Sequence, residues 1–244
     1  MPPLPDGRLL FPSAERNGPH ILAVLREYVG TLKGALPSTT APPAAETVLE
    51  VASGSGQHVA LFAAAMPSFA FQPTNYEEEK YAESLRAWTA AAAASASASA
   101  SAAEAAAESG GRVPRIKDAV FLDAAEVPWR HFPDGGGFAA IYNVNMAHIS
   151  PWATTVGLMA NAGRLLAPDA PLLMYGPFKV DGACTTESNA DFDASLRSKD
   201  ASWGIRDVAD VEAEAKRNGL RLVERREMPA NNFCLVFRRG LIAE

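Results

Sequence analysis

The sequence predicts an α/β fold with a doubly wound, seven-stranded and mostly parallel sheet that ends in an antiparallel strand pair. Short apolar segments alternate with helical segments along most of the chain, which is typical of parallel sheets covered by helices on both faces. A glycine turn, Gly54 to Gly56, joins the first strand directly to a helix. The last two strands, Arg221–Glu227 and Asn232–Arg238, are separated by a short turn, so we expect them to pair antiparallel.

Local signals set the bounds of the elements. The helix after the glycine turn stops at Pro67, which cannot continue it. Ser150 and Pro151 predict a helix start, as N-cap and first helical residue. Asp207 and Gly219 predict the cap and the end of the last helix. The predicted helices are Gln57–Met66, Glu77–Thr89, one from Ser150 to Leu166 and one from Asp207 to Gly219, and the remaining strands are Thr47–Ala52, Phe69–Gln72, Ala119–Leu122, Phe138–Asn143 and Ala170–Tyr175.

The chain of 244 residues is expected to form a single domain, residues 1–244, with two inserted segments. Residues 37–46 are rich in Pro, Ser, Thr and Ala, as linkers are. Residues 89–111 are almost purely Ala and Ser, and only methyl groups are available there for docking. We expect this low-complexity insertion to be a frayed, exposed helix or disordered, with no catalytic role.

Composition argues against several classes of function. A net charge of −6 and a pI of about 5.3 disfavour nucleic acid as the partner, because an acidic surface repels phosphates. Cys184 and Cys234 lack metal-binding spacing, so we expect neither a metal site nor a disulfide framework. No segment reaches the ~20 apolar residues of a membrane span, and the N-terminus lacks a signal-peptide pattern. A cytoplasmic protein is expected, and its oligomeric state is left open.

The glycine turn limits the ligands that the end of the first strand can bind. A dinucleotide site needs a third glycine where Val59 stands, and the spacings of a P-loop and a hydrolase elbow are absent. The remaining interpretation is a nucleoside–amino acid ligand without phosphate, S-adenosylmethionine. The alternative is a plain glycine turn above a buried or capping glutamate. The expected cofactor contacts in this segment are Glu50, Ala52, Ser53, Gly54 and Gly56.

Polar residues at the ends of the next three strands are expected to complete the cofactor pocket, since ligands bind at the carboxyl ends of such sheets. Asn75 follows the second strand and would hydrogen-bond the ribose hydroxyls, with Glu77 as the alternative. Asp123 follows the third strand and would contact the adenine amino group. Asn143 ends the fourth strand, where the methyl acceptor and the sulfonium would meet.

Further candidates lie near these strand ends. His148 is a candidate general base, with Asn145 beside it, because a neutral imidazole exists near pH 7; the alternative is a histidine that caps or packs. His58 would contact the cofactor carboxylate, or simply lie at a helix N-terminus. Arg16 and Asn17 are expected to precede the first helix and to fold over the cofactor. Arg16 would pair with a carboxylate, or form a structural salt bridge.

The region after the fifth strand is expected to form a substrate lid, because loops in this position often carry binding residues. Trp203 and Arg206 would hold a planar anionic substrate, and Tyr175 and Asn189 would line the same site. The alternative is a tryptophan that anchors the core, with Arg206 in a surface ion pair.

Motifs along nearly the whole chain resemble the methyltransferase-like 26 family of S-adenosylmethionine-dependent methyltransferases. The resemblance implies the class I methyltransferase fold and brings no substrate with it. The family usually has Asp at the position of Asn75. Loss of that charge is expected to weaken cofactor binding about five- to tenfold unless Glu77 substitutes. The matching segments are Leu10–Asn17, Glu50–His58, Gln72–Asn75, Asn143–Trp152, Tyr175–Phe178, Ser188-Asn189, Phe192-Asp193, Trp203–Asp207 and Asn231-Asn232.

The sequence therefore predicts an S-adenosylmethionine-dependent methyltransferase acting on a small-molecule acceptor. A second hypothesis is a non-catalytic protein that keeps the fold for interaction or cofactor sensing. It is motivated by Asn75, which stands where the resembled family usually has Asp. A third, a nicotinamide oxidoreductase, is weakened by Val59.

Overall fold

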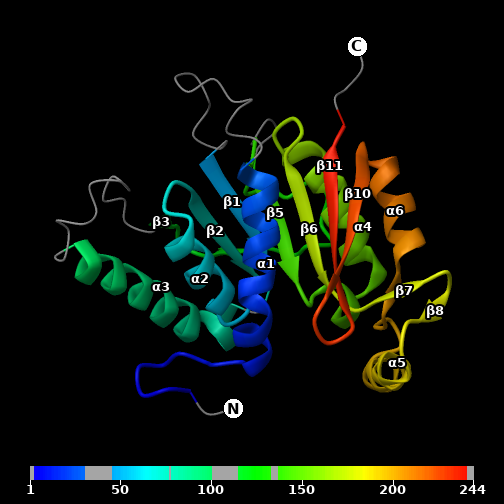
Figure 1. Cartoon of the computed structure of the whole chain (residues 1–244), viewed down its shortest axis with the longest axis horizontal. Coiled ribbons are helices and arrows are strands. Elements are labelled where there is room, and N and C mark those ends of the chain that lie inside the picture. Colours follow the sequence, from blue (N-terminus) through cyan, green and yellow to red (C-terminus); the bar gives the residue numbers. More distant parts are fainter. Residues whose placement is uncertain (1–2, 31–45, 77, 101–114, 133–136, 241–244) are drawn as a thin grey trace.

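The computed structural model describes residues 3–30, 46–76, 78–100, 115–132 and 137–240. Its main sheet has the strand order β10-β11-β6-β5-β1-β2-β3, and β4 also pairs with β2 (Figure 1). The strands are β1 Thr47–Val51, β2 Ala70–Asn75, β3 Arg115–Ile116, β4 Val120–Phe121, β5 Ala140–Val144, β6 Pro171–Gly176, β10 Leu220–Met228 and β11 Asn232–Arg239. The helices are α1 Pro12–Gly30, α2 Gln57–Ala65, α3 Glu78–Ala100, α4 Trp152–Leu165, α5 Glu187–Lys199 and α6 Val208–Arg217.

The predicted fold class is confirmed. Strands β2, β1, β5 and β6 pair in parallel, while β11 is antiparallel to both β6 and β10. From β1 the chain builds outward to β2 on one side and later returns to β5 on the other side. This reversal makes the carboxyl ends of β1 and β5 the switch point, where sheets of this kind bind ligands.

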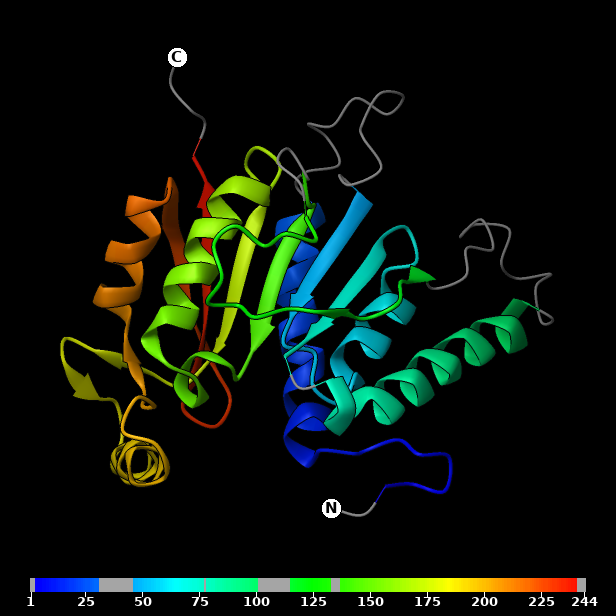
Figure 2. The same ribbon diagram turned by 180° about the vertical axis from the view of Figure 1, so that it is seen from behind.

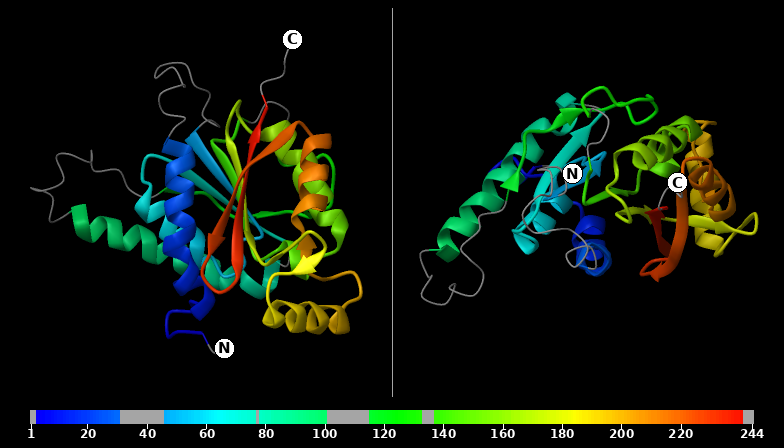
Figure 3. Two further views of the ribbon diagram at one scale, coloured as in Figure 1. Left: turned by 45° about the vertical axis from the view of Figure 1, so that its right-hand side comes forward. Right: turned by 90° about the horizontal axis from the view of Figure 1, so that it is seen from above.

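Two helical layers bury the two faces of the sheet. Helices α1 and α2 cover one face, and Figures 2 and 3 show α4 and α6 on the opposite face. Side chains of β1 alternate between the two layers, because successive residues of a strand point to opposite faces. Val48 packs toward α1 and α2, whereas Leu49 and Val51 pack toward α4 and α6. Both faces are covered, which explains the nearly continuous burial of β1.

Several predicted bounds were wrong. Strand β2 runs to Asn75, three residues beyond the predicted end, and the predicted third strand is two short pieces, β3 and β4. Helix α4 begins at Trp152, with Pro151 rather than Ser150 at the N-cap. The Ser150 hydroxyl instead donates to the Met146 carbonyl at 3.0 Å. Helix α3 continues to Ala100, because the propensity of alanine outweighs the interspersed serines. Residues 101–111, residues 37–45 and Glu77 lie outside the described part of the chain.

Two parts of the fold were not predicted. Helix α1 starts at Pro12, so Arg16 and Asn17 lie inside the first helix rather than before it. The predicted lid region contains helix α5 and a small sheet of three strands, ordered β8-β7-β9. Its strands are β7 Phe178–Val180, β8 Ala183–Cys184 and β9 Arg206–Asp207. Among the described residues, no helix combines the length and the hydropathy of a membrane-spanning segment.

Candidate active site at the carboxyl edge of the sheet

The carboxyl ends of the parallel strands meet at one edge of the sheet, at the bottom of Figure 1, where the N-terminal segment and helix α5 also lie. Main-chain groups of the N-terminal segment bond to this edge: Leu9 N–H donates to Ser84 Oγ at 2.9 Å, and Phe11 N–H donates to Gln57 Oε1 at 2.9 Å. Ser84 Oγ in turn donates to the Ser55 carbonyl at 2.9 Å. The N-terminal segment is thereby tied to the glycine turn through Ser84, which no sequence pattern had indicated.

The glycine turn is built from left-handed residues. Ala52, Gly54 and Gly56 have φ angles of 62°, 54° and 89°. A Cβ on Gly56 would lie 2.9 Å from the main chain of Leu85, so glycine is required there for packing. A Cβ on Gly54 would meet no described atom within 4 Å, so the turn is open on that side. Gly54 therefore leaves room for a ligand to approach the main chain closely.

Glu50 lies buried beneath this turn, 2% exposed, on the face that α1 and α2 cover. Burial raises its pKa to about 8, although Ser53 and Tyr142 oppose the shift. Its Oε2 atom is buried and has no hydrogen-bond partner among the described residues. The group is therefore largely the neutral acid at pH 7, because an ionised carboxylate without a partner is costly when buried, and a cationic donor from a ligand would favour the ionised form.

A polar cluster lies on the inner face of α1. Asn17 Oδ1 lies 2.8 Å from His58 Nε2. Burial lowers the pKa of His58 to about 4, so the ring is neutral at pH 7 and Nε2–H donates this bond. Burial raises the pKa of Tyr175, and the Asn17 side chain, the charge of Arg16 and the Asn232 side chain oppose that shift. The structure thus brings Asn17, His58 and Tyr175 together, and Arg16, exposed on α1, acts on Tyr175 through its charge.

At the end of β2, both ends of the Asn75 carboxamide bond to Gly54. Oδ1 accepts from the Gly54 N–H at 2.7 Å, and Nδ2 donates to the Gly54 carbonyl at 3.3 Å. At the end of β4, Asp123 Oδ1 accepts from the Ala125 N–H at 2.9 Å. Sequence reasoning missed Tyr76 and Phe121, whose rings lie 5.7 Å apart and are 61% and 42% exposed. Their signal was an aromatic residue at each of two adjacent strand ends.

On the other side of the switch point, Asn143 is 1% exposed and faces the α4 layer. Its Nδ2 is buried and has no hydrogen-bond partner in the described part of the chain. The switch point thus has an unpaired donor, Asn143 Nδ2, on one side and an unpaired acceptor, Glu50 Oε2, on the other. A zwitterionic ligand carries groups that can bond to both.

His148 and Asn145 converge above Gly176. A Cβ built on Gly176 would lie 3.4 Å from His148 Nδ1 and 3.7 Å from Asn145 Oδ1, so glycine keeps this space open. Burial lowers the pKa of His148 to about 4, and the charge of Arg206 contributes to the shift. The ring contacts Phe192 of α5 edge to face, with centroids 5.4 Å apart. His148 is thus a neutral base with an aromatic neighbour at pH 7.

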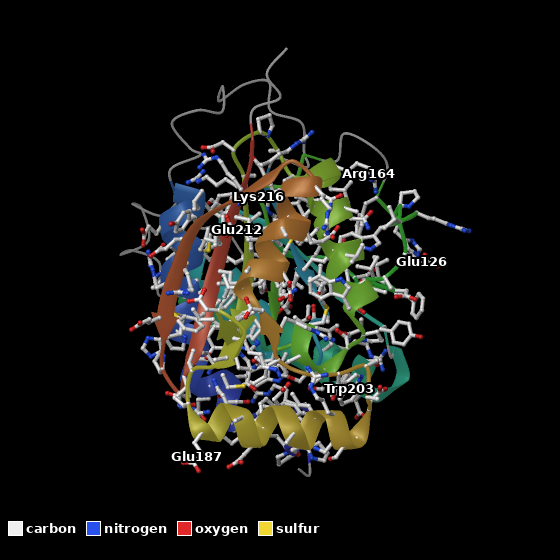
Figure 4. The ribbon with its side chains drawn as sticks, turned by 90° about the vertical axis from the view of Figure 1, so that its right-hand side faces the viewer. Glu126, Arg164, Glu187, Trp203, Glu212 and Lys216 are labelled. Carbon is white, nitrogen blue, oxygen red and sulfur yellow. The ribbon has the colours of Figure 1, made fainter. Side chains whose placement is uncertain are left out.

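The structure argues against an anion-binding role for Arg206. Its guanidinium donates to the carbonyls of Ala147 at 3.1 Å, Ser202 at 2.8 Å and Ser150. Arg206 therefore holds the 3₁₀ turn Ala147–Ile149, which carries His148. Asn189 is also engaged, because its Nδ2 donates to the Asn231 carbonyl at 3.1 Å. Trp203 is half-buried. In Figure 4 it lies just above α5, at the opposite end of this helix from Glu187.

Asp193 of α5 anchors the segment that carries Gly204 and Arg206. Its Oδ2 accepts from Lys179 Nζ at 2.7 Å, and its Oδ1 accepts from the Ile205 N–H at 2.6 Å. The neighbouring Gly204 N–H donates to the His148 carbonyl at 3.0 Å. Asp193 thereby connects α5 to the turn that holds His148.

We expect Asp193→Asn to lower the free energy of unfolding by about 1–2 kcal/mol at pH 7, because Lys179 loses its counter-charge. Burial alone would raise the pKa of Asp193, but Lys179, Ile205 and Arg197 outweigh it and lower the pKa. The ionised form thus stabilises the fold above pH ~4, and this contribution is lost as the pH falls through the lowered value. Urea unfolding from pH 7 to pH 3 measures it. The exposed Asp191→Asn on the same helix is the control, and equal stability of both variants at pH 7 would contradict the anchoring role.

Solved methyltransferases share this fold. The chain is similar to an O-methyltransferase family protein from Burkholderia thailandensis (15% identity, TM-score 0.62, 95% of this chain and 61% of that one). It is also similar to the mitomycin 7-O-methyltransferase MmcR (17% identity, TM-score 0.58, 94% and 58%). A third match is the S-adenosylmethionine-dependent methyltransferase SibL (16% identity, TM-score 0.59, 94% and 56%). The chain spans about three fifths of the length of these proteins.

These similarities establish the fold alone: the chain has the mostly parallel central sheet of class I methyltransferases. A family model matches residues 8–239, which is nearly the whole described chain. The chain belongs to the family described as a protein of unknown function, DUF938.

Proposed function

We propose that this protein is an S-adenosylmethionine-dependent methyltransferase that acts on a small-molecule acceptor. The observation that carries the proposal is Glu50, a buried carboxylate with an unpaired oxygen directly beneath an open glycine turn at the switch point. No phosphate-binding motif accompanies the turn. The similarity of the fold to O-methyltransferases and the resemblance of the sequence to the methyltransferase-like 26 family support the same conclusion.

The residues present fit this cofactor. Glu50 would receive its ammonium group, and the main chain at Gly54 would lie along its methionine part. The exposed rings of Tyr76 and Phe121, tilted by 31° to each other, offer an apolar surface for the adenine. When bound, the cofactor supplies an electrophilic methyl group on a sulfonium. The protein then acts mainly by aligning the acceptor with that methyl group.

His148 is proposed to take the proton of an acceptor hydroxyl, with Asn145 orienting that hydroxyl. The pKa of about 4 leaves the imidazole unprotonated across the physiological range, and it also makes His148 a weaker proton acceptor than an unperturbed histidine. Arg206 is bonded to main-chain carbonyls, and Phe192 and Ile149 are exposed beside the turn, 39% and 44% respectively. The sequence had predicted a planar anionic substrate. We instead propose an uncharged, hydroxylated and largely apolar acceptor.

Two experiments test the proposed function. Calorimetry with S-adenosylhomocysteine is expected to show binding, and the absence of binding at millimolar concentration would rule the cofactor out. A metabolite extract incubated with methyl-labelled S-adenosylmethionine is expected to yield a labelled product. Binding without any labelled product would favour a non-catalytic sensing module. Asn75 motivated that alternative, but its bonds to Gly54 give the side chain a different role.

We expect His148→Gln to lower turnover of the acceptor from this screen about 100-fold, because the proton then has no base to receive it. The affinity for S-adenosylhomocysteine is expected to stay within about twofold of wild type. His131→Gln, at an exposed position, is the control. Since the pKa of His148 is about 4, its protonation should reduce kcat only near and below that pH. A His148→Gln variant with wild-type turnover would exclude the general-base role.

A further inference from the structure

Asn75 is a buried side chain, 6% exposed, whose position the main chain fixes. It is the last residue of β2, and its carbonyl accepts from the Leu122 N–H at 3.0 Å. The preceding residue is also fixed, because the Thr74 N–H donates to Ser53 Oγ at 3.1 Å and its carbonyl accepts from the Ser53 N–H at 2.7 Å. The side chain of Asn75 therefore starts from a rigid strand end beside the glycine turn.

From this position the carboxamide matches the peptide groups of Gly54. It accepts the Gly54 N–H through Oδ1 and donates to the Gly54 carbonyl through Nδ2, at 2.7 and 3.3 Å. An aspartate has acceptors only, so it would keep the first bond and set an oxygen against the Gly54 carbonyl. Asparagine, and not aspartate, is the side chain that satisfies both groups.

Gly54 is the residue of the turn whose conformation needs this support. Its φ of 54° is left-handed, and its Cβ position is open, so side-chain packing does not hold it. Ala52 and Gly56, which flank it, are held by other contacts: the Ala52 N–H donates to Thr74 Oγ1 at 3.2 Å, and Gly56 packs on Leu85. The two bonds from Asn75 fix the peptide groups between them.

We propose that Asn75 is a positioning residue that holds Gly54 in the conformation that the cofactor requires, and that it is not a ribose ligand. This proposal rests on the proposed function. It reverses the expectation drawn from the sequence, in which asparagine was a weakened substitute for aspartate. In this chain both amide ends are engaged by Gly54, so a neutral side chain satisfies both of its peptide groups.

The two roles predict opposite results for Asn75→Asp. A positioning role predicts about tenfold weaker binding of S-adenosylhomocysteine, because one bond becomes a repulsion. A ribose-binding role predicts about five- to tenfold tighter binding, because the bond to the hydroxyls becomes charge-assisted. The same titration with 2′-deoxy-S-adenosylhomocysteine separates them again. If Asn75 only positions the turn, the ratio of Asn75→Asp affinity to wild-type affinity is the same for the deoxy analogue as for S-adenosylhomocysteine. If Asn75 binds the ribose, most of the difference in affinity between variant and wild type disappears with the deoxy analogue.

A third measurement needs no ligand. Amide hydrogen exchange of Gly54 is expected to be about tenfold faster in Asn75→Ala than in the wild-type protein, since its N–H loses its acceptor. Asn189→Ala is the matched control, because Asn189 is a buried asparagine that also donates to a main-chain carbonyl, at 3.1 Å, but outside the turn. Urea unfolding confirms that each variant folds.

The outcomes separate this inference from the proposed function. If wild type binds and Asn75→Asp binds more tightly, the positioning role is overturned and the proposed function stands. If wild type does not bind, the proposed function fails, and the exchange rate of Gly54 still decides whether Asn75 holds the turn. Unchanged exchange in Asn75→Ala would overturn the inference in either case.

Discussion

Gly54→Leu is expected to abolish detectable binding of S-adenosylhomocysteine, a loss of at least about 1,000-fold or roughly 4 kcal/mol. The Cβ of residue 54 points into open space at the switch point, so a leucine side chain would occupy the volume that the ligand needs. A Cβ at this position meets no atom of the described residues within 4 Å. Its expected loss of stability is about 1–2 kcal/mol, from placing a side chain at a left-handed φ of 54°. Calorimetry and urea unfolding measure the two effects.

Gly182→Leu is the matched control for this experiment. Gly182 also has a left-handed φ, 81°, and a Cβ there would likewise meet no described atom within 4 Å. It lies in the turn between β7 and β8, away from the strand ends of the switch point. We expect it to lose similar stability and to bind normally. Equal binding by both variants would show that the ligand does not approach Gly54.

The sequence was sufficient for the architecture because the architecture depends on periodicity. Alternating apolar segments, the glycine turn and the closing strand pair predicted the parallel sheet and its antiparallel edge, and these are confirmed. The predicted cap of α6 is also confirmed, since Asp207 accepts from the Ala209 N–H at 2.8 Å. Such signals are local, so they can be read from neighbouring residues.

Side-chain partners depend on distant segments, and local sequence patterns do not specify them. From the sequence, Arg206 was expected to bind an anionic substrate. Its guanidinium donates instead to the carbonyls of Ala147 and Ser150, more than 50 positions away. Asn75 was expected to face the ribose and instead bonds Gly54, 21 positions earlier. Arg16 and Asn17 were placed outside a helix that in fact contains them. For Arg206 and Asn75 the partners are main-chain groups, which sequence patterns do not place.

Glu50→Gln is expected to raise the free energy of unfolding of the ligand-free protein by about 3 kcal/mol at pH 7. Burial raises the folded-state pKa of Glu50 from 4.5 to about 8. Between these values the folded state binds more protons than the unfolded state, so wild-type stability falls as the pH rises from ~4.5 to ~8. Each pKa unit is worth about 1.4 kcal/mol, which gives the ~3 kcal/mol at pH 7 and almost no difference below pH ~4.5. Urea unfolding across this range measures the trend.

The same substitution is expected to weaken binding of S-adenosylhomocysteine at least tenfold, because the ligand's ammonium loses its carboxylate. In the wild type this ammonium favours the ionised form of Glu50, so binding at pH 7 should release close to one proton. Calorimetry in two buffers of different ionisation enthalpy detects that proton, and Glu50→Gln should not release it.

Glu214→Gln provides the contrast, because Glu214 is buried on α6 but bonded to Arg217 at 2.7 Å. Removing a partnered charge there is expected to lower stability and leave binding unchanged. A Glu50→Gln variant that is no more stable than wild type, or that binds with the same proton release, would contradict the role of Glu50. A residue that destabilises the free protein and is needed only when the ligand is present is explained by binding, not by folding.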